Sequence, residues 1–203
     1  MSHHAPDCTA EEALERLKAG NARFVGGQGH FPSLQKEILA DLAGGQQPYA
    51  TILGCSDSRV PPEVVFDAHL GELFVVRVAG NVLGNAIFGT LQYAGAHLRT
   101  PLFVVMGHEG CGAVEAAIAT KFHGAEHKSR IELLVDDILP ALDGLDGSQP
   151  PEALLHSAVE ANVRWTLKTL RETPEVKAVG STSGIKLVGA IYELETGRVR
   201  FLE

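Results

Sequence analysis

The sequence is poor in cysteine, with only Cys8, Cys55 and Cys111 among 203 residues. An odd and sparse set of thiols does not make a disulfide framework, and the first residues lack the basic segment and apolar stretch of a secretory signal. We therefore expect a cytoplasmic protein, because a reducing compartment keeps thiols available as metal ligands or nucleophiles.

Long apolar runs and surplus positive charge are also missing. No run approaches the roughly 18 apolar residues that span a bilayer. The chain carries 17 Lys and Arg residues against 25 Asp and Glu residues, a formal net charge of −8. Binding to nucleic acids or anionic membranes relies on excess positive charge, so we expect neither as a partner. A locally positive cleft would still suit an anionic small molecule.

The pattern that is present predicts one α/β domain spanning residues 1–203. Hydrophobic residues make up 45% of the chain and charged residues 21%, which is typical of globular proteins. Strands are expected at residues 50–53, 73–78, 102–106, 185–192 and 198–202. The first three are near-continuous apolar runs that alternate with helical patterns, which predicts a mostly parallel sheet flanked by helices. A turn at residues 195–197 predicts an antiparallel edge strand at the end.

Apolar residues at helical spacing lie between and around these strands. Helices are expected at residues 9–24, 34–42, 87–98, 112–118, 129–142 and 151–170. Two of them begin with capping-box patterns, Thr9 with Glu12 and Ser129 with Glu132. The face of the last helix that should point inward consists of Leu155, Val159, Val163, Leu167 and Leu170.

Two of the three cysteines occupy equivalent places, each just after a buried strand. Cys55 follows the strand at 50–53, and His108 and Cys111 follow the strand at 102–106. Ligands of open parallel sheets gather at the carboxyl ends of the strands, so these three side chains can meet there. Cys111 also precedes a helix, whose positive end should favour its thiolate.

Two cysteines and one histidine suit tetrahedral zinc with one position left open. Asp57 is the only obvious fourth ligand, and Arg59 on the same loop competes for its carboxylate. Two states follow: Asp57 pairs with Arg59 and zinc holds water, or Asp57 ligates zinc and closes the site. From spacing alone, the cysteines could equally be small buried apolar residues, and Asp57 and Arg59 a surface ion pair.

Three sequence blocks carry a family resemblance. CSDSRVPPE at 55–63, FVVRVAGN at 74–81 and GHEGCGAV at 107–114 resemble the signature blocks of β-carbonic anhydrases. Shorter matches at residues 20–24, 91–94, 162–163 and 185–202 follow in the expected order. The resemblance thus covers nearly the whole chain beyond the first dozen residues.

This resemblance implies a catalytic zinc ion on Cys55, His108 and Cys111, with Asp57 and Arg59 as a dyad beside the metal-bound water. The implied activity is the reversible hydration of carbon dioxide to bicarbonate and a proton by zinc-bound hydroxide. The expected partner is therefore a small-molecule substrate, carbon dioxide or bicarbonate. In the well-known carbonic anhydrase with three histidine ligands, the pKa of zinc-bound water is about 7, and two thiolates should raise that value by cancelling the metal charge.

Further residues resemble the lining of the family's substrate cleft. Gln46 is similar to a glutamine that donates a hydrogen bond to the substrate, and Phe74 and Tyr93 to aromatics that reach in from a neighbouring subunit. His97 resembles a residue that passes protons outward. The resemblance therefore implies a homodimer or homotetramer, in which an N-terminal helical extension, residues 1–45, packs on the partner subunit.

One position departs from a subgroup of the family. Members that trap bicarbonate in an inhibitory pocket carry tryptophan three residues before the first zinc cysteine, where this chain has Ile52. Arg77 and Tyr192 resemble the other two members of that pocket. Because isoleucine cannot replace an indole donor, we expect the open subtype, with Asp57 held by Arg59 at neutral pH.

Other functions stay open at this point. The same site could hydrolyse carbonyl sulfide or carbon disulfide, which are linear analogues of carbon dioxide. A non-catalytic zinc or bicarbonate-binding protein, with Asp57 closing the metal site, is a second alternative. A thiol redox enzyme is disfavoured, because no Cys-x-x-Cys motif occurs.

Overall fold

The computed structural model describes residues 8–30, 39–40, 42–174, 176 and 184–202. Its five-stranded sheet has the order β2-β1-β3-β4-β5. The strands are β1 (Ala50–Gly54), β2 (Leu73–Arg77), β3 (Leu102–His108), β4 (Lys186–Tyr192) and β5 (Val199–Leu202). Strands β1 to β4 pair in parallel, and β5 pairs antiparallel with β4. The predicted parallel sheet with an antiparallel edge strand is confirmed.

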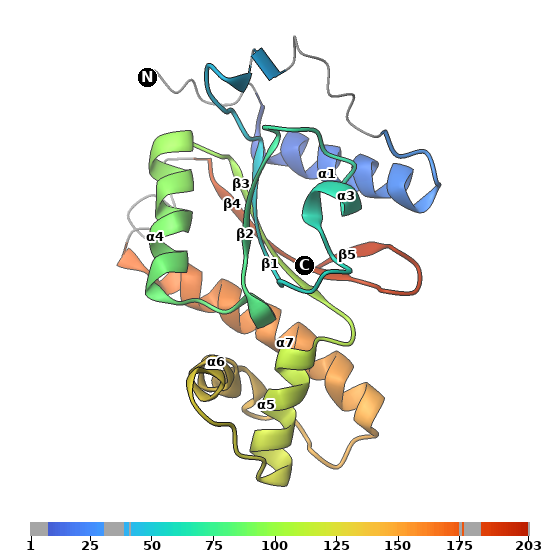
Figure 1. Ribbon diagram of the computed structural model, residues 1–203, viewed down its shortest axis with the longest axis vertical. Coiled ribbons are helices and arrows are strands. Elements are labelled where there is room, and N and C mark those ends of the chain that lie inside the picture. The colour runs from blue at the N-terminus through green and yellow to red at the C-terminus, as the bar shows by residue number, and fades with distance from the viewer. Residues whose placement is uncertain (1–7, 31–38, 41, 175, 177–183, 203) are drawn as a thin grey trace.

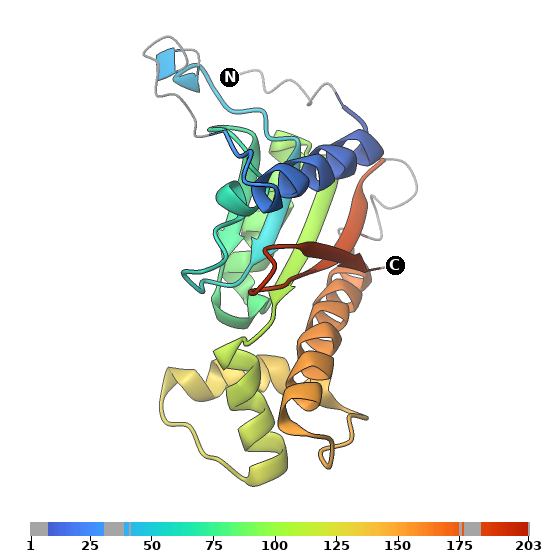
Figure 2. The ribbon, with the colours of Figure 1, turned by 90° about the vertical axis from the view of Figure 1, so that its right-hand side faces the viewer.

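Helices cover both faces of the sheet, as Figure 1 shows. They are α1 (Ala10–Val25), α3 (Pro62–Val65), α4 (Asn85–Tyr93), α5 (Gly112–His123), α6 (Arg130–Ile138) and α7 (Pro151–Glu172). Helices α1 and α3 lie on one side of the strands and α4 on the other, while α5 and α6 lie beyond the carboxyl end of β3, where α5 packs against α7 (Figure 2). None of the helices in the described part of the chain combines the length and apolar character needed to cross a bilayer.

Alternate residues of the strands pack into two separate buried clusters, one on each face of the sheet. Ile52 of β1 and Leu17 of α1 belong to one buried cluster. The next strand residue, Leu53, packs instead with Leu91 of α4 and Leu167 of α7. Successive residues of a strand point to opposite faces, so a strand buried on both faces must be apolar throughout. This requirement explains the near-continuous apolar runs of the sequence.

The capping box that begins α1 is present. The Thr9 hydroxyl accepts a hydrogen bond from the Glu12 amide at 3.2 Å, and the Glu12 carboxylate accepts one from the Thr9 amide at 2.8 Å. Further along, the Asn21 side chain accepts from the Val199 amide at 2.9 Å and donates to the Val65 carbonyl at 3.1 Å. These bonds tie α1 to the edge strand β5 and to α3, which follows the Cys55 loop.

Two helix predictions need correction. Ser129 does not cap α6, because its φ of 71° and ψ of −139° are not the extended conformation that capping requires, and its side chain makes no capping bond. The helix expected at 87–98 is not uniform: α4 ends at Tyr93 and continues as a π-helical segment, Ala94–Leu98. Leu34 and Ile38, on which the helix at 34–42 depended, lie outside the described residues.

Helix α7 lies close against the sheet beside β3. Val159, Val163, Leu167 and Leu170 are buried as predicted, while Leu155 is only half-buried. A Cβ atom on Gly107 would lie 2.7 Å from a methyl group of Val163, so only glycine permits this approach. The contact brings the middle of α7 next to His108, the last residue of β3.

Candidate metal centre

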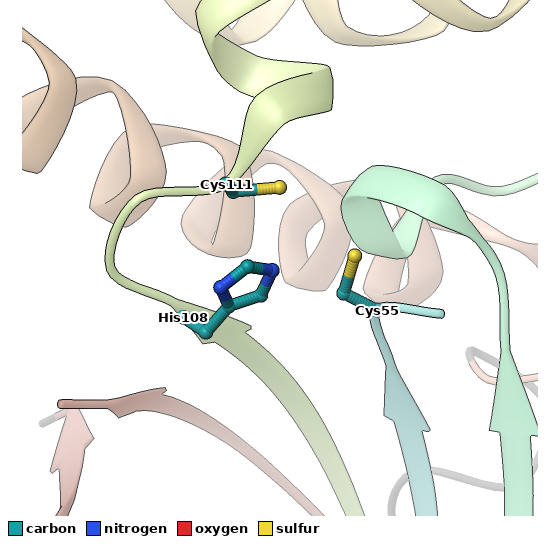
Figure 3. A group of neighbouring side chains, drawn as sticks. All are labelled: Cys55, His108 and Cys111. Carbon is teal, nitrogen blue, oxygen red and sulfur yellow. The ribbon is translucent and has the colours of Figure 1, made fainter. Parts of the chain in front are cut away.

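Three side chains converge at the carboxyl ends of β1 and β3, which are neighbouring strands. Cys55 follows β1 directly, His108 ends β3, and Cys111 is the residue that caps the start of α5. Figure 3 shows the two sulfur atoms and the imidazole pointing toward one another. One ligand atom from each residue lies within 4.8 Å of the others, and all three residues are buried. The structure therefore brings together the three residues that the sequence singled out.

The orientation of His108 is fixed by the backbone of the next residue. Its Nδ1 atom lies 2.8 Å from the Glu109 carbonyl oxygen, so this nitrogen carries the proton and donates. The opposite atom, Nε2, is buried and makes no hydrogen bond within the described part of the chain. Metal-binding histidines typically donate their second ring nitrogen in this way. A cation between Nε2 and the two sulfur atoms would satisfy the buried nitrogen, so the residues present fit a metal ion.

The two thiols shift each other's ionisation. Contact with Cys111 lowers the pKa of Cys55 to about 4, and the same contact raises the pKa of Cys111. The backbone amides of Ala113 and Val114 at the start of α5 do lower its pKa, but Cys55 and burial outweigh them. Two adjacent thiolates repel each other, so both ionise only when a cation neutralises their charge.

Protons also compete with a metal at the histidine. Burial disfavours the charged imidazole, but the neighbouring Cys55, the Glu109 carbonyl and Asp57 together outweigh burial and raise the pKa of His108. Metal ligands must lose their protons, so metal binding to this set of residues releases protons and weakens as pH falls.

Asp57 and Arg59 form a two-pronged ion pair at the edge of the three ligands. Arg59 Nε donates to Asp57 Oδ1 at 2.9 Å, and Nη2 donates to Oδ2 at 2.7 Å. The Arg59 backbone amide also donates to Oδ1 at 2.9 Å. Arg59 thereby holds the pKa of the Asp57 carboxyl far below its usual range. Oδ2 lies 3.9 Å from His108 Nε2, which places an ionised carboxylate beside the metal ligands.

Two further residues support the cysteine loop, and sequence reasoning gave neither this role. Arg77 donates through Nε to the Cys55 carbonyl at 3.0 Å and through Nη2 to the Asp57 carbonyl at 2.6 Å. The Gly80 amide donates to Cys55 Sγ at 3.4 Å. Arg77 could have been noticed as a charged residue at the end of an apolar strand. Gly80 could have been noticed as part of the block at 74–81 that resembles the family.

Within the described residues, no hydrogen bond or ring contact joins the remaining predicted site residues to the three ligands. Gln46 is exposed and precedes β1, whereas Cys55 follows it. Five strand residues at about 3.3 Å each separate them by about 16 Å. The Phe74 ring lies 6.1 Å from the Tyr93 ring, which lies 5.0 Å from the His97 ring. These aromatics lie along β2 and α4, and Tyr93 is 41% exposed.

The three residues named for the inhibitory pocket make other contacts in this chain. Ile52 and Tyr192 are both buried in the apolar core. Arg77 uses two of its donors on the cysteine loop. Ile52 offers no side-chain hydrogen bond, so the indole donor of that pocket has no counterpart at this position.

Comparisons with known proteins agree with this geometry. The carbonic anhydrase family model matches residues 50–199. Carbonic anhydrase 2 of Mycobacterium tuberculosis is 38% identical, over 95% of this chain and 93% of its own. The β-carbonic anhydrase CafA of Aspergillus fumigatus superposes with a TM-score of 0.75 at 26% identity, over 95% of this chain and 90% of its own. The fold also matches a tetrameric β-carbonic anhydrase of Sordaria macrospora with a TM-score of 0.76 at 22% identity, over 94% and 97%. The chain therefore belongs to the β-carbonic anhydrase family of enzymes.

Proposed function

We propose that this enzyme catalyses the reversible hydration of carbon dioxide to bicarbonate and a proton, with a zinc ion held by Cys55, His108 and Cys111. The observation that carries the proposal is the buried meeting of two sulfur atoms with an imidazole nitrogen that has no other partner in the described chain. Metal analysis combined with a hydration assay tests it.

Zinc is the cation that this donor set suits best. Thiolate sulfur and imidazole nitrogen favour zinc over magnesium or calcium, which prefer oxygen ligands. Three protein ligands leave one tetrahedral position for water, as in catalytic rather than structural zinc sites. A bound zinc ion supplies a Lewis acid that lowers the pKa of the water it holds, so a nucleophile is available near neutral pH.

Asp57 and Arg59 would position the reacting water. Asp57 is ionised and so can only accept hydrogen bonds, which lets its carboxylate take one from the water and turn an oxygen lone pair toward carbon dioxide. Arg59 occupies both carboxylate oxygens and keeps Asp57 turned away from the role of a fourth ligand. We therefore assign the chain to the open subtype, in which the dyad stays paired at neutral pH.

Carbon dioxide hydration should increase as pH rises from neutral to mildly alkaline values. Two thiolates cancel the double charge of zinc and weaken its pull on the proton of the reacting water, so deprotonation needs higher pH than with three neutral histidines. Stopped-flow hydration rates measured from acid to alkaline pH check this expectation. A rate that stays flat over that range contradicts the charge argument.

The substrate cleft would be completed by a second copy of the chain. Gln46 lies at the amino end of β1, and Phe74 lies on β2, an edge strand of the described sheet. Tyr93 is exposed beside it, and the exposed His97 contacts Tyr93. We propose a homodimer or homotetramer in which these residues line the neighbour's site and the N-terminal extension, residues 1–45, packs across the contact. His97 would pass protons to buffer.

Mixing a weakly active variant with an inactive one tests this arrangement. Gln46→Ala should lower hydration about tenfold, the value of one lost hydrogen bond, and Cys55→Ala should remove the metal. In a mixed dimer, the intact metal site of the Gln46→Ala chain receives Gln46 from its partner. When equal amounts of the two chains associate at random, half of the dimers are mixed, and each mixed dimer has one complete site. The rate per subunit should therefore recover to about a quarter of the wild-type rate. The same pairing with His97→Ala tests His97.

Two results would contradict the shared cleft. Recovery no greater than the average of the two parents means that Gln46 does not act across a subunit contact. Full activity of Gln46→Ala alone removes Gln46 from the substrate site. Refolding the two chains together, rather than mixing finished oligomers, ensures that subunits exchange.

A further inference from the structure

One polar side chain of α7 lies against the metal centre without belonging to it. Asn162 is 1% exposed, and its Nδ2 donates to the Gly80 carbonyl oxygen at 2.8 Å. Its other polar atom, Oδ1, is buried and has no hydrogen-bond partner within the described residues. An unpaired buried polar atom is unfavourable for stability. Packing alone therefore does not explain a polar side chain at this position. Its one hydrogen bond, to Gly80, is the feature that can explain it.

Gly80 connects Asn162 to the metal ligands. It lies in a short 3₁₀ turn, Ala79–Asn81, and its amide donates to Cys55 Sγ at 3.4 Å while its carbonyl accepts from Asn162. Its φ of 66° is a conformation that glycine adopts at no steric cost. A Cβ atom there would lie 2.8 Å from Ile138 Cδ1. Because one residue carries both groups, fixing its carbonyl also limits where its amide can point.

A second bond from α7 to the same turn provides a comparison. The Thr166 hydroxyl donates to the Asn81 carbonyl oxygen at 3.4 Å. Thr166 is also buried, one helical turn after Asn162. Its bond is made to the neighbouring residue, Asn81, whereas the hydrogen bond to the Cys55 sulfur comes from Gly80. Of these two bonds from α7, only that of Asn162 is made to the residue whose amide donates to a metal ligand.

We infer that Asn162 is a positioning residue for the metal centre: by holding the Gly80 carbonyl, it keeps the Gly80 amide on the sulfur of Cys55. The inference rests on the proposed function, in which Cys55 binds the metal. Hydrogen bonds to a ligating sulfur withdraw electron density from it and tune the metal. The Gly80 bond thus makes Cys55 a weaker donor, which leaves more positive charge on the cation to act on water.

Cobalt(II) is the probe for this effect, because its thiolate complexes absorb through sulfur-to-metal charge transfer. Metal-free protein is titrated with Co²⁺, and the spectra of wild type, Asn162→Leu and Thr166→Val are compared. Asn162→Leu keeps the number and branching of the side-chain heavy atoms but removes the donor. Loss of the Gly80 bond raises the energy of the sulfur electrons, so its charge-transfer band should move to longer wavelength. Thr166→Val should leave the band in place.

The zinc enzymes provide a second readout. The pH midpoint of hydration should rise in Asn162→Leu, and activity at neutral pH should fall about tenfold, as for other residues that support a metal ligand. Thr166→Val should keep the wild-type midpoint. Circular dichroism and thermal unfolding establish that each variant is folded, and Asn162→Ala serves as a second variant if leucine does not fit.

The outcomes separate this inference from the proposed function. If wild-type protein takes up neither zinc nor cobalt, the proposed function itself fails. If wild type binds cobalt and the folded, loaded Asn162→Leu has the same band and the same pH midpoint, the positioning role is overturned alone. It is also overturned if both Asn162 variants fail to fold, because Asn162 is then a structural residue, or if Thr166→Val shifts the band equally.

Discussion

Cys55→Ala should abolish metal binding and carbon dioxide hydration together. The substitution removes one of three ligands from a buried site whose remaining donors, His108 and Cys111, cannot hold zinc in a catalytic geometry. Losing the Lewis acid costs about 4 kcal/mol of transition-state stabilisation, which corresponds to about a thousandfold in rate. Zinc content by elemental analysis and stopped-flow hydration on the same preparation measure both effects.

The chain offers a matched control in its third cysteine. Cys8 lies before α1, remote in sequence from the ligands, and Cys8→Ala should keep wild-type zinc content and activity. Normal hydration by metal-free Cys55→Ala protein would show that the ligand assignment is wrong. Loss of zinc from Cys8→Ala would show the same.

Arg59→Ala should lower hydration about 10–100-fold while zinc content stays near that of wild type. Asp57 would lose the two hydrogen bonds from the guanidinium and keep only the one from the backbone amide of residue 59, so its carboxylate would be free to turn toward the metal. Its Oδ2 already lies 3.9 Å from His108 Nε2. Global stability should change little, because the Arg59 side chain is 55% exposed.

The control for this charge removal is Arg164→Ala. Arg164 forms an ion pair with Glu160 at 2.8 Å on the exposed side of α7, away from the ligands. Its replacement should leave both zinc content and turnover unchanged. Wild-type turnover in Arg59→Ala would exclude the dyad from the mechanism. Arg59→Lys should fall between wild type and alanine, since lysine cannot make the two-pronged contact.

The sheet could be predicted from sequence because burial on both faces leaves a strong pattern. Residues 50–53 and 102–106 are apolar at every position apart from Thr51, and the structure places both in the centre of the sheet. The capping box at Ser129 failed for a different reason: the motif fixes which side chains are available, but Ser129 has a φ of 71° and a ψ of −139°, and its side chain makes no capping bond. Local patterns predict elements better than they predict terminal geometry.

The ligand set could be predicted because strand ends in a parallel sheet share one edge. The mutual shift of the two thiol pKa values could not, because it arises from the contact between Cys55 and Cys111, which are far apart in the chain. The block at 74–81 singled out Gly80 as part of a motif, but the bonds that it makes to Cys55 and Asn162 were out of reach. They run through a backbone amide and a backbone carbonyl, and no side-chain pattern in the sequence reports such contacts.

Zinc content measured together with hydration activity on the purified wild-type protein is the most direct test of the account. We predict about one zinc ion per chain, the number that one set of three ligands holds. Chelation should remove activity, and zinc should restore it. Protein that takes up no zinc when supplied with it, or that hydrates carbon dioxide at full rate after its metal is removed, would contradict the central claim.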